Sequence, residues 1–115
     1  MSHYFDRSGQ PLALMQWAAL LEDNDYRRVA WDEVGPYVVS TVWLGIDYGF
    51  GRTEVPLIFE TMVFDTRRQI ETPSGPVNES AECWRWPTEM AARAGHDQAV
   101  AWARERTGAP KDTGP

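Results

Sequence analysis

Apolar side chains are concentrated in the middle of the chain, in two runs that flank a glycine-containing segment. The runs are YVVSTVWL at 37–44 and PLIFETMVF at 56–64, and both faces of each run are mainly apolar. Such a pattern is typical of strands inside a sheet. Because the two runs follow each other at moderate spacing, they favour an antiparallel meander.

Less apolar segments on either side predict the outer parts of this sheet. Residues 26–34 predict a strand before the central pair, and 82–86 predict a fourth strand with Trp84 and Trp86 on one side. Residues 65–81 are polar and are interrupted by prolines and a glycine, so they predict a surface loop.

Helical spacing of apolar side chains appears near both ends of the chain. Residues 14–21 carry one apolar stripe and predict a helix. Thr88 is a good N-cap for a second helix that runs to about Arg106. The fold class is therefore expected to be α+β, an antiparallel sheet of about four strands with two helices packed on it. We expect a single domain over 1–106 and a disordered tail over 107–115.

Charge and cysteine content exclude several classes of function. The chain has 115 residues and a net charge of −6, and its arginines form pairs rather than a basic stripe, so no direct nucleic acid ligand is expected. Its single cysteine cannot form an internal disulfide, and no apolar stretch approaches the ~20 residues of a membrane span. These features favour a cytoplasmic protein without membrane contact.

The segment between the central runs is the first candidate for a binding site. It reads GIDYGFGR over 45–52, and its glycines permit close approach of the backbone to a ligand. Tyr48 and Phe50 are suited to stacking, and Arg52 to a phosphate group. No helix is expected to follow, so the segment is not a phosphate-binding loop of the usual kind. The alternative is a long hairpin connection whose rings cover the end of the sheet.

Glu60 is the second candidate, because a carboxylate inside an apolar strand requires a partner or an open face. A salt bridge to Arg28 or Arg85 is one interpretation, and a carboxylate that faces a ligand is another. A third interpretation groups Glu60 with Asp47 and His96 for acid–base chemistry.

The remaining reactive side chains favour structural roles. His96 lies on the expected sheet-facing side of the last helix, where a single histidine is typically a hydrogen-bonded core residue. His3, Cys83 and His96 show no metal-ligand spacing, so neither a metal nor another cofactor is expected. Cys83 is expected to be a buried, inert thiol.

Trp84 and Trp86 are the third candidate. If the last helix covers their face of the sheet, they belong to the core. If it does not, they form an exposed aromatic patch that marks an interface, and a homodimer through this strand becomes plausible.

Several of these segments together resemble a group of small uncharacterised proteins of actinobacteria and their phages. The similar segments are YFDRSGQPLALMQWAALLED, STVWLGIDYGFG, PLIFETMVF and TEMAARAGH, and the resemblance covers roughly residues 4–103. This chain departs from the group at Tyr48, where histidine is common, and in its longer 65–81 segment. The resemblance implies a mobile, phage-encoded cytoplasmic accessory protein that acts by binding, for example to a host protein or a signalling nucleotide.

The expected function is therefore binding without catalysis, with a host protein or a nucleotide-like small molecule as the partner. The expected site residues are Asp47, Tyr48, Phe50, Arg52, Glu60, Trp84 and Trp86. One alternative is a small hydrolase-like enzyme that uses Asp47, Glu60 and His96. Another is a structural or assembly subunit.

Overall fold

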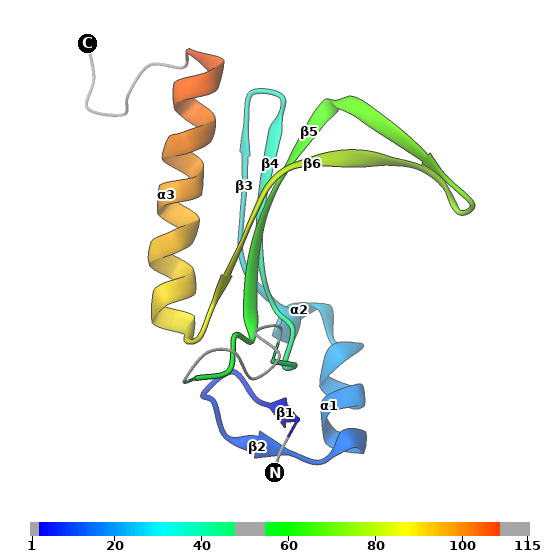
Figure 1. Ribbon diagram of the computed structural model, residues 1–115, viewed down its shortest axis with the longest axis vertical. Helices are drawn as coiled ribbons and strands as arrows, with labels where there is room; N and C mark the ends of the chain where they lie inside the picture. The colour runs from blue at the N-terminus through cyan, green and yellow to red at the C-terminus, as the bar shows by residue number, and fades with distance from the viewer. Residues whose placement is uncertain (1–2, 48–54, 109–115) are drawn as a thin grey trace.

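A computed structural model describes residues 3–47 and 55–108 of the chain (Figure 1). The N-terminal part is a short hairpin followed by two helices: β1 (Tyr4–Phe5), β2 (Pro11–Leu12), α1 (Leu14–Leu21) and α2 (Asn24–Arg27). Four longer strands and a long helix follow: β3 (Arg28–Val34), β4 (Tyr37–Trp43), β5 (Phe59–Thr72), β6 (Gly75–Trp86) and α3 (Glu89–Thr107).

The four longer strands form one antiparallel sheet in the order β3-β4-β5-β6. This order confirms the predicted α+β class and the meander, with the apolar strand β4 in an internal position. The described residues contain three helices instead of the two expected, because Asp23 caps the single turn α2. That turn replaces the beginning of the strand predicted over 26–34, so β3 starts at Arg28.

One face of the sheet is covered by α3, as Figure 1 shows. Alternate side chains of β4 are buried on this face, from Tyr37 through Val39 and Thr41 to Trp43. The helix presents mainly small residues to them, including Ala92, Ala99 and Ala103. Small side chains let the helix lie close to the sheet, and Thr88 caps its N-terminus by accepting from the N–H of Ala91 as predicted.

The opposite face of the sheet, here called the open face, is covered by no helix in the described ranges. Its side chains follow from the cross-strand register, since directly paired residues point to the same side. They are Arg28, Trp31 and Glu33 of β3, Val38, Ser40 and Val42 of β4, Glu60, Met62 and Phe64 of β5, and Cys83 and Arg85 of β6.

The prediction of a surface loop over 65–81 is wrong. Most of this segment continues β5 and β6 into a bent hairpin. The register shifts between Asp65 and Gln69, and β5 carries three more residues than β6 there. Such a bulge bends a ribbon. Beyond it, Gln69–Asn78 forms what we call the arm, which curves away from α3 (Figure 1). Both faces of the arm contact solvent, so its sequence lacks the apolar alternation that identifies a strand.

The C-terminal end of α3 is at Thr107, followed by Gly108 in a left-handed conformation with φ of 68°. Residues 109–115 of the predicted disordered tail lie outside the described residues. A separate property concerns membranes: in the ranges described, the helices are too short or too polar to cross one.

Candidate functional site

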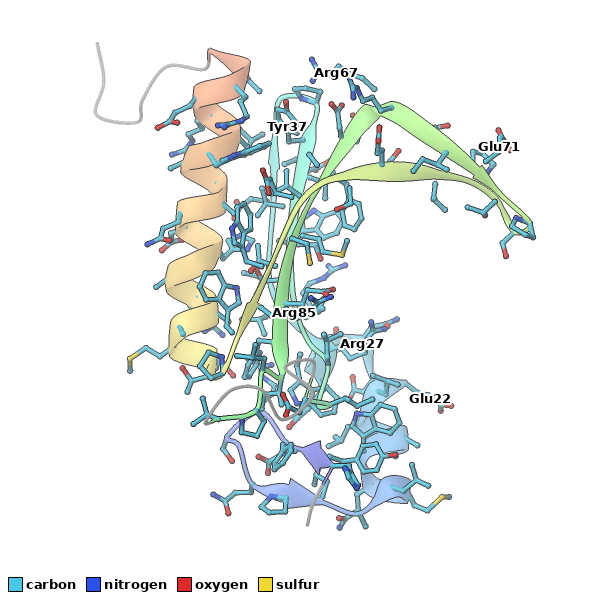
Figure 2. The ribbon with its side chains drawn as sticks, viewed as in Figure 1. Glu22, Arg27, Tyr37, Arg67, Glu71 and Arg85 are labelled. Atoms are coloured by element: carbon cyan, nitrogen blue, oxygen red, sulfur yellow. The ribbon has the colours of Figure 1, made fainter. Side chains whose placement is uncertain are left out.

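A cleft of about 490 Å³ lies where the arm leaves the sheet, beside the C-terminal end of α3. Figure 2 shows Arg67 at the bend of the arm, with Tyr37 of β4 close to it. The cleft draws its side chains from four separate elements and is lined by Tyr37, Asp65, Arg67, Arg68, Glu79, Ser80, Ala81, Trp102 and Arg106. We call it the arginine–aromatic cleft.

The bulge in β5 positions one wall of this cleft. Thr66 donates both its N–H and its hydroxyl to the carbonyl of Pro36, over 2.9 Å and 2.7 Å, which fastens the bulge to the β3–β4 turn. Arg67 then folds back on Asp65 with Nε 3.0 Å from Oδ1 and Nη2 2.9 Å from Oδ2. These hydrogen bonds lower the pKa of the Asp65 carboxyl to about 2 and raise the pKa of Arg67. Both groups therefore stay charged at neutral pH.

Two adjacent aromatic rings in the cleft have a guanidinium group at each end. Arg67 lies 5.4 Å from the ring centre of Tyr37, and the Tyr37 and Trp102 rings meet edge to face at 5.4 Å. At the other end, the Arg106 guanidinium lies 3.8 Å from the Trp102 ring centre and donates to the Trp102 carbonyl over 3.1 Å. Cation–π contact holds both guanidinium groups in place, which lowers the entropy lost when they bind a ligand.

The charge of the cleft is opposite to that of the chain. Three arginines line it against two carboxylates, those of Asp65 and Glu79. Arg68 is 72% exposed and lies 3.9 Å from Glu79, a separation that leaves its donors accessible to a ligand. The local excess of positive charge stands within a chain of net charge −6.

His96 belongs to a buried hydrogen-bond chain on the α3 side of the sheet. Its Nε2 lies 2.8 Å from Asp32 Oδ2, and its Nδ1 lies 2.7 Å from the Thr41 hydroxyl. The chain continues from Thr41 to the Thr61 hydroxyl over 2.6 Å, and the indole N–H of Trp86 donates to Thr61 over 3.0 Å.

Because a carboxylate only accepts hydrogen bonds, Nε2 of His96 donates to Asp32. Nδ1 of His96 shares a hydrogen bond with the Thr41 hydroxyl, and the Thr41 and Thr61 hydroxyls share the next one. The Thr61 oxygen accepts from the indole N–H of Trp86. The order Asp32–His96–Thr41 is that of a catalytic triad. However, Thr41 is 0% exposed and His96 only 3% exposed, so no substrate reaches the hydroxyl. The predicted core role of His96 is confirmed.

Glu60 lies on the open face, where its Oε2 is 3.3 Å from Nη2 of Arg85. The predicted salt bridge with Arg85 is therefore confirmed. The Cys83 thiol points to the same carboxylate over 3.5 Å. Cys83 is exposed, because its side chain points to the open face. The prediction that this thiol is buried is therefore wrong. Partial desolvation and the nearby Glu60 charge raise the pKa of this thiol, which disfavours the reactive thiolate.

The acid–base grouping of Asp47, Glu60 and His96 is not formed. Glu60 lies on the open face and His96 lies beneath α3, on opposite sides of the sheet. Asp47 accepts a hydrogen bond from the N–H of Leu57 over 3.0 Å, which joins the two ends of the intervening segment. The prediction of a hydrolase site is therefore wrong. Neighbouring residues of a strand point to opposite faces, and Thr61, which adjoins Glu60, is the residue that points to the side of His96.

Of the other expected site residues, three lie outside the described ranges and two lie in the core. Tyr48, Phe50 and Arg52 lie outside the described residues. Trp84 and Trp86 are partly buried and pack against the apolar core clusters under α3, and the Trp86 ring lies against Gly95. This placement favours the core interpretation of the two tryptophans. The exposed tryptophan of the sheet is instead Trp31, on the open face.

The residues of the arginine–aromatic cleft were not recognised from the sequence. The adjacent Arg67 and Arg68 were the only visible signal, because the other contributors come from β4, β6 and α3. No group of His, Cys, Asp or Glu side chains within 3–47 and 55–108 has the arrangement needed to hold a metal ion. Comparison of the chain with protein-family models, with curated proteins and with solved structures finds no match.

Proposed function

We propose that the protein binds a small anionic molecule with a planar ring in the arginine–aromatic cleft, without changing it chemically. The observation that carries this proposal is the convergence of three guanidinium groups and two aromatic rings on one cavity. A cavity of about 490 Å³ falls within the range of ~300–1,000 Å³ for small-molecule sites. The acidic remainder of the chain repels anions, so this local positive charge is what permits an anion to approach.

The side chains divide the expected recognition between two parts of the ligand. Guanidinium forks donate parallel hydrogen bonds to carboxylate or phosphate oxygens, a role that suits Arg68 and Arg106. The rings of Tyr37 and Trp102 offer apolar contact to a planar group. Nucleotides combine both chemical features, so a nucleotide-like molecule is the ligand class that fits best.

The biological setting is part of the same proposal. The resemblance to phage and actinobacterial proteins implies an accessory or counter-defence protein, and capture of a nucleotide-like signal suits such a role. The segment containing Tyr48, Phe50 and Arg52 combines rings with a cation in the same way. We retain that segment, with Asp47, as a separate candidate binding element, because Asp47 follows the end of β4 opposite to the cleft residue Tyr37.

The proposal is tested by calorimetric titration of the purified chain with AMP, adenosine and inorganic phosphate. We expect AMP to bind more tightly than either of the other two, because only AMP engages the rings and the arginines together. AMP recovered after long incubation should be unchanged. AMP that binds no better than adenosine, or that shows no heat of binding at millimolar concentration, contradicts the proposal.

Matched variants on α3 and the bulge localise the site. Replacing Arg68→Gln or Arg106→Gln should each weaken AMP binding about tenfold or more, because a hydrogen bond to a charged group contributes ~1.5–3 kcal/mol. Arg93→Gln is the control, since Arg93 lies on α3 outside the cleft and pairs with Glu89. Equal affinity in all three variants places the ligand elsewhere and rejects the cleft.

A further inference from the structure

The two carboxylates of the arginine–aromatic cleft differ in how many hydrogen bonds they already accept. Asp65 is saturated by Arg67, since Oδ1 accepts from the backbone N–H and from Nε over 3.0 Å each and Oδ2 accepts from Nη2 over 2.9 Å. The Glu79 side chain is 43% exposed, and its Oε2 lies 3.9 Å from Nη1 of Arg68, beyond hydrogen-bond range. Among the described residues of the cleft, Glu79 therefore keeps its carboxylate oxygens available to accept from a ligand.

The sheet places Glu79 in one row with the aromatic wall of the cleft. Tyr37 of β4 pairs with Asp65 of β5, and Asp65 pairs with Glu79 of β6, so the three side chains project from the same face of the sheet. Neighbouring strands are ~4.8 Å apart, so the backbones of Tyr37 and Glu79 are separated by about 10 Å. Arg67 bridges the first two members of the row, because it donates to Asp65 and to the Tyr37 hydroxyl, the latter over 3.2 Å. A planar ring stacked on this fixed guanidinium group can direct one edge toward Glu79.

A free carboxylate selects the edge that such a ring presents. Its two oxygens lie side by side and only accept hydrogen bonds. Guanine carries two adjacent donors, N1–H and the N2 amino group, so it satisfies both oxygens at once. Adenine presents an acceptor, N1, beside its amino group, which leaves one carboxylate oxygen unpaired against a lone pair. A site built around a polar group rejects a ligand that cannot pair with that group.

We propose that the cleft is specific for guanine nucleotides, with the Glu79 carboxylate accepting from N1–H and from the N2 amino group of the base. This inference rests on the proposed function and adds the identity of the base. Hydrogen bonds of about 3 Å on the far sides of Glu79 and Arg68 separate the base edge from the phosphate by up to about 10 Å, which leaves room for the sugar. Because Glu79 repels a phosphate group, the reversed orientation of the nucleotide is disfavoured.

Calorimetric titration of the full chain with GMP, IMP and AMP tests this proposal. The three nucleotides share the sugar and the phosphate and differ at the edge of the base. GMP offers Glu79 two adjacent donors, whereas IMP lacks the N2 amino group and AMP lacks N1–H. We expect GMP to bind about tenfold or more tightly than either of the others, because each lost hydrogen bond involves a charged acceptor.

Substitution of Glu79 tests the role of this side chain. A glutamine amide offers one acceptor and one donor, which matches the amino group and N1 of adenine, so Glu79→Gln should lower the ratio of GMP to AMP affinity at least about tenfold. Glu79→Ala offers neither and should bring the ratio close to one. The ratio isolates the base, since loss of the Glu79 charge alters phosphate binding equally for both nucleotides. Glu71→Gln is the control, because Glu71 is an exposed glutamate of β5 outside the cleft and should leave the ratio unchanged.

The outcomes separate this inference from the proposed function. GMP that binds no better than AMP, or a ratio that Glu79→Gln leaves unchanged, overturns guanine recognition while binding of a planar anion in the cleft stands. Binding of none of the three nucleotides contradicts the proposed function and overturns this inference with it. Thermal melts of each variant establish that the fold is retained, and a change in the ratio does not arise from lost stability, which weakens both ligands alike.

Discussion

Replacing Gly95→Ala should destabilise the protein, although alanine is the better helix former. Gly95 lies inside α3, where this exchange normally stabilises a helix by about 1 kcal/mol. A Cβ at this position, however, overlaps Cζ2 of the Trp86 indole and lies 2.5 Å from Cε2 and 2.7 Å from Cη2. The indole cannot move away freely, because its N–H donates to buried Thr61.

Two destabilising effects and one stabilising effect determine the size of the loss. Moving the helix or the ring costs about 1–3 kcal/mol, as in other overpacked cores. Losing the hydrogen bond between Trp86 and Thr61 leaves a buried group unpaired, which costs a further ~1–3 kcal/mol. After the gain of about 1 kcal/mol in helix propensity is subtracted, we expect a net loss of about 1–5 kcal/mol. For a domain of this size that lowers Tm by at least about 4 °C.

Urea denaturation followed by tryptophan fluorescence measures this loss. Ala94→Gly is the control, because Ala94 is exposed on the same helix and should lose only the propensity term of about 1 kcal/mol. In a Trp86→Phe background the smaller ring leaves room for a methyl group, so Gly95→Ala should cost less there. A Gly95→Ala variant that is more stable than the wild type refutes the tight contact between α3 and Trp86.

Three further predictions concern single polar groups. Thr41→Val should cost about 2–4 kcal/mol, because His96 Nδ1 and the Thr61 hydroxyl lose their buried partner. Thr66→Val loses one exposed hydrogen bond to Pro36 and should cost only about 0.5–1.5 kcal/mol; urea denaturation compares the two variants. The Asp65 carboxylate has a lowered pKa of about 2, so it stabilises the fold fully above about pH 4 and loses this effect as the pH falls toward 2. The Tm difference between wild type and Asp65→Asn should therefore shrink across that interval, and a constant difference contradicts the lowered pKa. Glu60→Gln should shift the pH midpoint of Cys83 alkylation by iodoacetamide downward, since the Glu60 charge helps to raise the thiol pKa; an unchanged midpoint rejects that contribution.

Patterns among neighbouring residues were sufficient to predict much of the sheet. The alternation in 37–44 and 57–64 predicted β4 and the inner half of β5, and Thr88 marked the start of α3. The same reasoning failed for the arm. A ribbon with solvent on both faces needs no apolar alternation, so its prolines and polar side chains resembled a loop.

The candidate sites also differ in whether a short stretch of sequence reveals them. Glu60 was correctly recognised as a carboxylate that needs a partner, because one buried charge in an apolar strand is a local signal. The arginine–aromatic cleft has no local signal, since Tyr37, Arg67 and Trp102 are ordinary residues in their own segments. Only the bulge in β5 and the end of α3 bring them together.

The sequence by itself determined the class of fold, the identity of the central strands and the small-residue character of α3. Each of these follows from the periodicity of burial along one element, which is written in adjacent residues. Tertiary structure alone decided the partners of His96, the direction of the arm and the convergence of the arginines. These depend on register shifts and on contacts between residues far apart in the chain, where no short pattern specifies which groups meet.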